Sequence, residues 1–258
     1  MNLVIKLLQK LKLYSIVKTI KDIIIKMTPK YKKQKRKMIA FYSQFVHSDD
    51  LCFDVGANTG NRTEIFLELG ARVVVIEPQT SCIRILEEKF GEDKKITIIP
   101  KALGEKKGEA ELKISDATTI SSLSQEWINS VKASGRFSAY NWEKAEKVQI
   151  TTFDELIDEC GKPVFCKIDV EGYEYEVLKG LTQPVGVISF EFTPEHIAPA
   201  ISSIKHLAGL GNTAYNYSIG ESMKLVLQEW VTVDEIIQIL TTLPDKTVFG
   251  DVYARFLK

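Results

Sequence analysis

The sequence predicts an α/β protein with a doubly wound, mainly parallel central sheet. Apolar runs typical of strands alternate with helix-type segments along most of the 258 residues. A glycine-bearing turn follows the first of these strands, as in nucleotide-binding α/β units. The composition, 45% hydrophobic and 26% charged, is ordinary for a globular protein and leaves room for one large domain with appendages.

The first 38 residues differ from the rest in charge. They carry twelve Lys or Arg and one Asp, about +11, whereas the remainder carries about −11. Apolar residues recur at helical spacing from Asn2 to Met27, and Thr28-Pro29 is expected to end this amphipathic helix before a basic linker. We therefore separate a basic N-terminal segment, 1–38, from a larger globular domain, 39–258.

The partners of segment 1–38 remain open at this stage. No apolar run is long enough for a membrane span, and no signal-peptide pattern is present. A basic amphipathic helix can lie on an anionic membrane face, but packing against the domain or a twin subunit is favoured. We expect a cytoplasmic protein, with peripheral contact at the inner membrane face as an alternative. The acidic body argues against a nucleic-acid partner.

The domain is predicted to alternate strands and helices after a short helix and turn at 39–50. Strands are expected at 51–55, 72–77, 95–99, 109–114, 148–152, 164–169, 185–192, 214–218, 224–227 and 247–256. Helices are expected at 62–69, 79–90, 153–160, 170–180, 198–207 and 233–240. The Ser/Thr-rich insert 115–147 is predicted to be a lid or acceptor loop, although its aromatics could simply anchor it.

The stretch 52–60 marks the expected ligand site. Gly56 allows a tight turn at the strand end, and Gly60 lets the helix start lie close to a ligand. The spacing is not G-x-G-x-x-G, and Asp54 would repel a pyrophosphate, so a dinucleotide fits poorly.

A second acid completes the ligand prediction. Glu77 ends the next strand, 23 residues after Asp54, where an acid accepts hydrogen bonds from ribose hydroxyls. Asp54 suits an ammonium group. Together they indicate a nucleoside with a cationic amino-acid end, such as S-adenosylmethionine (SAM). The loop 100–104, with Ala102, is expected beside the adenine, and a non-binding α/β protein is the alternative.

Three further acids are predicted at the same sheet edge. Asp169 ends one strand, Glu171 follows it, and Glu191 closes the neighbouring strand. One shielded carboxylate can serve as a base, or two can hold a divalent ion. Lys167 lies on the same strand face as Asp169, where it can pair with these acids. His196 is the next catalytic candidate, and Glu174 and Glu176 are expected to be exposed.

Four stretches together resemble the FkbM family of SAM-dependent methyltransferases. They are FDVGANTG at 53–60, IEP at 76–78, KIDVEGYE at 167–174 and SFE at 189–191, within a similarity that covers roughly 51–253. The resemblance implies a Rossmann-like methyltransferase fold and a SAM site at Asp54, Gly56, Asn58, Gly60 and Glu77. It also implies methylation of a hydroxyl on a sugar, glycan or natural-product acceptor.

The predicted site is therefore the following. The cofactor-binding set is Asp54, Gly56, Ala57, Asn58, Thr59, Gly60, Glu77, Pro78 and Ala102, and the catalytic set is Asp169, Glu171, Glu191 and His196. No resident metal is predicted, and a homo-oligomer is left open. The four cysteines lack metal spacing and indicate a reduced compartment. The competing interpretations are an NAD-dependent oxidoreductase and a non-catalytic, membrane-tethered SAM-binding domain.

Overall fold

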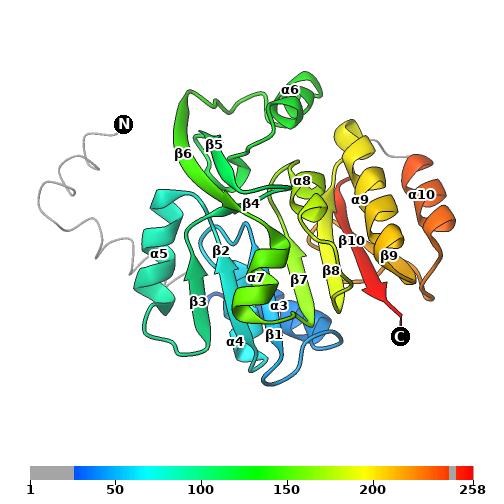
Figure 1. Cartoon of the computed structure of the whole chain (residues 1–258), viewed down its shortest axis with the longest axis horizontal. Helices are drawn as coiled ribbons and strands as arrows, with labels where there is room; N and C mark the ends of the chain where they lie inside the picture. Colours follow the sequence, from blue (N-terminus) through cyan, green and yellow to red (C-terminus); the bar gives the residue numbers. More distant parts are fainter. Residues whose placement is uncertain (1–25, 244–247, 258) are drawn as a thin grey trace, which may run out of the picture.

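A computed structural model describes residues 26–243 and 248–257. Its centre is a seven-stranded sheet with strand order β3-β2-β1-β7-β8-β10-β9 (Figure 1). The strands are β1 (Leu51–Val55), β2 (Arg72–Ile76), β3 (Ile96–Ile99), β7 (Phe165–Ile168), β8 (Val187–Phe192), β9 (Thr213–Ile219) and β10 (Gly250–Phe256). Neighbours from β3 to β8 pair in parallel, whereas β10 runs antiparallel to β8 and β9. The predicted doubly wound, mainly parallel fold is confirmed.

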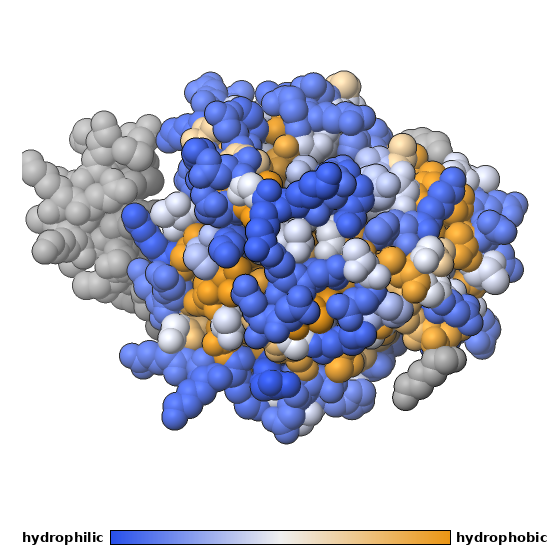
Figure 2. Space-filling view, viewed as in Figure 1, coloured by the Kyte–Doolittle hydropathy of each residue, from blue (hydrophilic) through white to orange (hydrophobic). Residues whose placement is uncertain are grey.

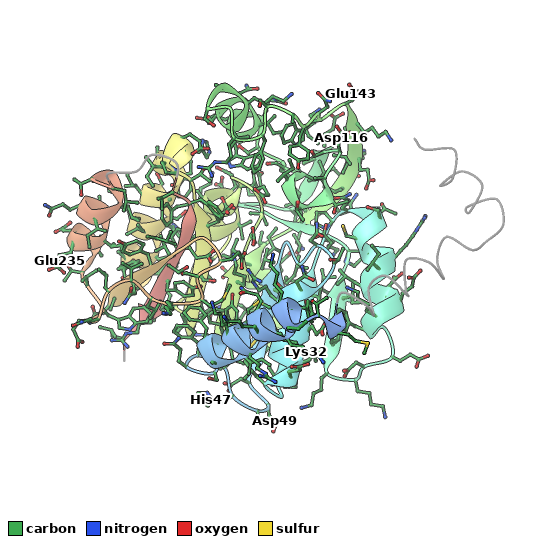
Figure 3. The ribbon with its side chains drawn as sticks, turned by 180° about the vertical axis from the view of Figure 1, so that it is seen from behind. Lys32, His47, Asp49, Asp116, Glu143 and Glu235 are labelled. Carbon is green, nitrogen blue, oxygen red and sulfur yellow. The ribbon has the colours of Figure 1, made fainter. Side chains whose placement is uncertain are left out.

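Helices cover both faces of the sheet. The helices are α3 (Pro29–Tyr42), α4 (Asn61–Glu68), α5 (Thr80–Phe90), α7 (Phe153–Cys160), α8 (Glu174–Lys179), α9 (Ile197–Leu210) and α10 (Val233–Thr241). Helices α7 to α10 pack on one face, and α3, α4 and α5 pack on the other (Figures 1 and 3). The parallel strands form from continuous apolar runs, because helices cover both faces of the sheet and the side chains on both faces are buried.

The basic run after Thr28 is helical rather than a linker. The Thr28 hydroxyl accepts a hydrogen bond from the Tyr31 amide at 3.2 Å, and Pro29 occupies the first turn. Proline suits a helix start as well as a stop, because amides in the first turn have no intrahelical acceptor and the missing N–H of proline costs nothing there. Met38, Phe41 and Tyr42 then bury the apolar side of α3. The amphipathic helix predicted before Thr28 lies outside the described residues, apart from its last two.

The insert forms a second layer above the carboxyl edge of the main sheet (Figure 1). Within the insert 115–147 lie the 3₁₀ turn η1 (Thr118–Ile120) and α6 (Gln125–Ala133), and the flanking strands of this layer are β4 (Ala102–Leu103), β5 (Gly108–Ile114) and β6 (Lys144–Thr151). The three strands form a small sheet in the order β4-β6-β5. Trp127 and Trp142 pack edge to face at 6.5 Å, and Trp142 donates its indole N–H to the Ile120 carbonyl at 2.8 Å. The insert therefore has an aromatic core of its own.

The strand predicted at 224–227 is wrong. This stretch is irregular, although Val226 donates its amide to the Tyr217 carbonyl at 2.8 Å. The Asn216 side chain bonds both the amide and the carbonyl of Leu227, at 3.1 and 2.9 Å. A side chain thus satisfies the backbone groups that a ladder would otherwise pair.

The surface is mainly hydrophilic on the face shown in Figure 2, with apolar side chains in separate patches. Cys52 and Cys166 are fully buried in core strands, and all four cysteines are free thiols. None of the described helices has the length and apolar content needed to cross a membrane.

Candidate active site

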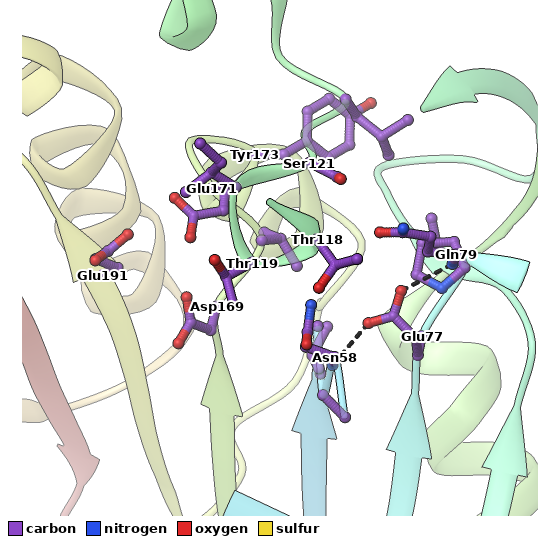
Figure 4. Close-up of a pocket in the computed structure, with 18 of the residues that line it drawn as sticks. Asn58, Glu77, Gln79, Thr118, Thr119, Ser121, Asp169, Glu171, Tyr173 and Glu191 are labelled. Atoms are coloured by element: carbon purple, nitrogen blue, oxygen red, sulfur yellow. Dashed lines mark hydrogen bonds between the residues drawn. The ribbon is translucent and has the colours of Figure 1, made fainter. Parts of the chain in front are cut away.

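A cavity of about 470 Å³ lies at the carboxyl edge of the main sheet, roofed by the insert (Figure 4). It spans the point between β1 and β7 where strand order reverses, the usual ligand site of such sheets. Gly56 forms the turn directly after β1 and has a φ of 77°. A Cβ there would lie 1.9 Å from the carbonyl oxygen of Asp169, so only glycine lets the two strand ends approach.

Glu77 is held at the end of β2 by two backbone amides. Its carboxylate accepts hydrogen bonds from Asn58 N at 2.7 Å and Gln79 N at 2.8 Å (Figure 4). Burial raises the pKa of Glu77 to about 7, against the lowering effect of these bonds. Each oxygen keeps a lone pair that can accept a ligand hydroxyl.

Asp54 lies on the cavity wall at the end of β1, only 2% exposed. The Thr63 hydroxyl donates to its Oδ2 at 2.5 Å and so orients the carboxylate. Burial raises the pKa of Asp54, while this bond and the charges of Arg62 and Lys167 oppose the rise. The site is thus prepared for one positive group.

Most of the predicted cofactor residues line the cavity, but two do not. Those on the wall are Asp54, Gly56, Ala57, Asn58, Glu77, Pro78 and Ala102. Gly60, with φ of 82°, starts α4, and a Cβ there would lie 2.5 Å from the Phe90 ring. Its glycine is explained by helix packing rather than by ligand approach. The Thr59 carbonyl accepts a hydrogen bond from Lys89 at 2.6 Å, also away from the cavity wall.

Three carboxylates lie together on the side of the cavity opposite Glu77 (Figure 4). Asp169, Glu171 and Glu191 each offer an oxygen within 4.8 Å of the other two (Figure 4). Burial raises the pKa values of Glu171 and Glu191 well above normal, and the charge of Asp169 adds to both shifts. Burial would also raise the pKa of Asp169, but the charges of Lys167 and Arg62 outweigh it and lower that pKa. Asp169 is therefore the member that stays ionised.

Lys167 lies directly behind this cluster and is fully buried. Its ammonium group is 3.1 Å from Asp169 Oδ2 and 2.9 Å from Asp251 Oδ1. Asp251 stands opposite Glu191 in the β8–β10 pairing. The sequence analysis missed Asp251, because nothing in its local strand pattern distinguishes it from a solvent-facing residue.

The loop that carries Glu171 is clamped from two sides. Glu174 is buried, not exposed as predicted, because it accepts hydrogen bonds from the amides of Val170 and Gly172 at 3.2 and 3.1 Å. Burial raises its pKa to about 7. A Cβ at Gly172 would lie 2.2 Å from Trp127, so the insert packs directly on this loop. Glu176 pairs with Lys179 at 2.7 Å on the outer side of α8.

The structure does not bring His196 onto the cavity wall. This residue ends η2 (Pro194–His196), and burial lowers its pKa. Its neighbour Glu195 instead accepts hydrogen bonds from Arg136 at 2.5 and 3.1 Å. Arg136 belongs to the insert and lines the cavity, so this pair ties the insert to the segment after β8.

Several cavity residues were not predicted individually. They include Arg62, Gln79, Lys101, Thr118, Thr119, Ser121, Leu123, Arg136, Phe137, Tyr173, Thr193 and Glu221. The Ser/Thr-rich composition of the insert was the available signal for part of this set. Buried acids at two points of a largely preformed cavity, with a glycine turn between strands, match the shape and charge of a nucleoside that carries an ammonium group. The residues present therefore fit SAM.

Two sequence comparisons with known proteins identify relatives of this chain. The family model described as the methyltransferase FkbM domain matches residues 54–243. The hexuronic acid methyltransferase AglP of Haloferax volcanii is 26% identical over 164 residues, which cover 63% of this chain and 62% of AglP. The chain thus spans less than two thirds of that relative.

Solved structures with similarity are remote. A precorrin-6Y C5,15-methyltransferase from Geobacter metallireducens has a TM-score of 0.46 at 9% identity, over 86% of this chain and 87% of its own. A methyltransferase-like protein from Streptococcus mutans, in complex with SAH, has a TM-score of 0.40 at 9% identity, over 85% and 95%. The family match covers most of the catalytic domain and sets aside the oxidoreductase interpretation. This chain belongs to the FkbM methyltransferase family, with SAM as its cofactor.

Proposed function

We propose that the protein transfers the methyl group of SAM to a hydroxyl group of a sugar, glycan or natural product. The observation that carries this proposal is the cluster of Asp169, Glu171 and Glu191 in the cavity that also holds Asp54 and Glu77. Similarity to a hexuronic acid methyltransferase supports a sugar-type acceptor.

In this proposal two acids divide the recognition of the cofactor. Glu77 accepts hydrogen bonds from the ribose hydroxyls, and Asp54 binds the methionyl ammonium group. Pro78 and Ala102 line the cavity beside Glu77, where an adenine would lie. Replacing Glu77 with Ala should weaken binding of S-adenosylhomocysteine (SAH) by about 2–3 kcal/mol, as measured by calorimetry. Unchanged affinity would contradict the assignment.

The acid cluster prepares the acceptor oxygen. Bound SAM supplies an activated methyl group, so the protein must align the acceptor oxygen with it and take up the hydroxyl proton. Asp169 is ionised at neutral pH and accepts the hydrogen bond from that hydroxyl. Glu171 and Glu191, whose pKa values are raised, share the released proton more readily than Asp169 could hold it alone.

Asp169→Asn tests this role. The amide keeps the shape of the side chain but cannot accept a proton, so turnover should fall about 10²–10⁴-fold with little change in SAH affinity. Glu176→Gln, on the outer side of α8, is the matched control and should keep normal turnover. The acceptor is first found by transfer of labelled methyl groups from SAM to cell-envelope extracts.

Three other results would redirect the assignment. Near-normal turnover of Asp169→Asn would move the base to Glu171 or Glu191. Loss of wild-type activity in EDTA, restored by Mg²⁺, would assign the acids to a divalent ion instead. A protein that binds SAH but methylates no acceptor would favour the non-catalytic alternative.

We also propose peripheral contact of the N-terminal segment with an anionic membrane. The observation that supports it is the basic exposed surface of α3, where Lys30, Lys32, Lys33, Arg36 and Lys37 are all exposed. Lys32 is labelled in Figure 3. Each basic residue near such a surface contributes about 1 kcal/mol. Vesicle co-sedimentation should weaken in high salt and after charge reversal at Lys32 and Lys33. Salt-independent self-association in sedimentation velocity would favour the twin-subunit alternative.

A further inference from the structure

Arg62 is an incompletely paired guanidinium on the cavity wall. It lies in the first turn of α4, and its side chain is 17% exposed. Nη2 donates to the two carboxylate oxygens of Glu221 at 2.7 and 2.6 Å, and Nη1 contacts the Met38 sulfur at 3.1 Å. Nε is buried and has no hydrogen-bond partner among the described residues. A guanidinium has five donors, so this one retains capacity for another acceptor.

Glu221, the ion-pair partner of Arg62, is more exposed to solvent than Arg62 itself. The Glu221 side chain is 60% exposed, follows the end of β9, and also lines the cavity. An ion pair with a solvent-exposed member contributes little, because water competes for the charge. A carboxylate that entered the cavity could therefore replace Glu221 at small cost.

The position of Arg62 indicates which carboxylate this would be. Thr63, the next residue along α4, donates its hydroxyl to Asp54, the proposed partner of the ammonium group. Because the α-amino and α-carboxylate groups of the cofactor share one carbon, their protein partners must lie close together. Arg62 and Asp54 meet this condition, because both line the cavity and the charge of Arg62 opposes the rise that burial causes in the pKa of Asp54.

The other cations on the wall are placed less well. They are Lys101 and Arg136. Lys101 follows β3 on the adenine side of the cavity. Arg136 is held bidentately by Glu195, which is only 12% exposed in its side chain.

We propose that Arg62 binds the methionyl carboxylate of SAM and that Glu221 is its place-holder, displaced when the cofactor enters. Arginine matches a carboxylate in geometry and stays charged at all physiological pH values. This inference rests on the proposed cofactor site. It adds a binding residue and an internal competitor to that site.

Calorimetry with two ligands tests the proposal. SAH carries the amino-acid end, and 5′-methylthioadenosine carries the same nucleoside without it. Arg62→Met should weaken SAH binding about ten- to hundred-fold and leave methylthioadenosine binding unchanged, since a hydrogen-bonded charge typically contributes that much. Equal losses for both ligands would mean that Arg62 only supports the fold, and would overturn the proposal.

The second variant guards against a folding defect in the first. Glu221→Gln, at an exposed position, should tighten SAH binding about three- to tenfold, because the guanidinium no longer has a charged competitor. The gain should vanish for methylthioadenosine and in the Arg62→Met/Glu221→Gln double variant. Unchanged or weaker SAH binding by Glu221→Gln would overturn the place-holder role. Wild-type protein that binds neither ligand would instead overturn the proposed cofactor site and this inference with it.

Discussion

The two faces of the central sheet bury different chemistry. Strand β7 shows the contrast, because Cys166 and Ile168 face the helices α7 to α10, whereas Phe165 and Lys167 face α3 and α4. The first face is apolar along the strands that meet it. On the second face, the alternation of side chains along the strands produces a belt of charged and polar groups near the carboxyl edge of the sheet. We call it the charged belt, and it is made of Asp54, Lys167, Ser189, Glu191 and Asp251.

The two faces therefore have different roles: the apolar face stabilises the fold, and the charged face prepares the site. Apolar side chains stabilise by leaving water, without directional requirements. Buried ion pairs seldom stabilise more than apolar residues of similar volume, because desolvation offsets the attraction. On this face the hydroxyls of Ser189 and of Tyr42 in α3 are buried and have no hydrogen-bond partner among the residues that the structure describes. We infer that the charged face is retained for the cavity above it.

Lys167→Met is expected to give the largest effect on stability. It leaves Asp169 and Asp251 buried without their cation, which should cost about 3–5 kcal/mol of unfolding free energy at pH 7. In the wild type the lowered pKa of Asp169 means that its contribution is present above its ordinary value of 3.8 and lost below it. The variant raises that pKa, so its deficit should shrink as pH falls and the carboxyls become neutral.

Phe190→Ala is the matched change on the apolar face. It creates a cavity and should cost a similar amount, about 3–5 kcal/mol. No titrating group is involved, so this deficit should be the same at pH 7 and pH 5. Urea unfolding of both variants at the two pH values makes the comparison. Identical pH dependence of the two deficits would show that the faces do not differ as described.

Local pattern predicted the strands of the main sheet, but it also predicted a strand at 224–227 that the structure lacks and missed the short strand β4. Leu51–Val55 and Arg72–Ile76 have the predicted bounds at their starts, since continuous apolar runs between turns are strong signals. Helix α3 was missed because Thr28-Pro29 is compatible with both a helix end and a helix start. Its burial depends on contacts with distant strands, which no local window contains.

The site was predictable where residues end strands. Asp54, Glu77 and Asp169 follow from the rule that ligands bind at carboxyl edges. Asp251 was not, because its role depends on β10 inserting antiparallel beside β8, a long-range choice. Glu174 was mistaken for a surface residue, because only the bend of the 170–172 loop turns its carboxylate inward.

Glu77 tests how a buried acid of the site titrates when backbone amides, rather than a cation, stabilise it. Unlike Asp169, it is held by amides alone, and burial raises its pKa to about 7. In the proposed cofactor site, ribose hydroxyls donate to the ionised carboxylate, so SAH affinity should fall as pH drops through 7. The expected loss between pH 8 and pH 6 is about tenfold. Calorimetry on Glu77→Gln, which cannot ionise, gives the control, and an equal slope in that variant would assign the titration to another group.

The smallest expected effect on stability concerns the ion pairs between α3 and α4, the helices that cover the charged face of the sheet. Lys35 forms ion pairs with Glu64, at 2.9 Å, and with Glu68, and its side chain is 22% exposed. Partly exposed pairs contribute little, so Lys35→Ala should lower the unfolding free energy by about 0.5 kcal/mol, and less in 1 M salt. Lys32 lies on the same helix, is exposed (Figure 3), and makes no ion pair within the described part of the chain.

Lys32→Ala is therefore the matched control for that measurement. Both substitutions introduce the same helix-favouring residue, so any difference between them isolates the ion pairs from helix propensity. Thermal unfolding in low and high salt should show a salt-dependent loss for Lys35→Ala alone. If the two variants behave alike, α3 is held by Met38, Phe41 and Tyr42 without electrostatic help. In that case the useful charge of this face is confined to the belt beneath the cavity.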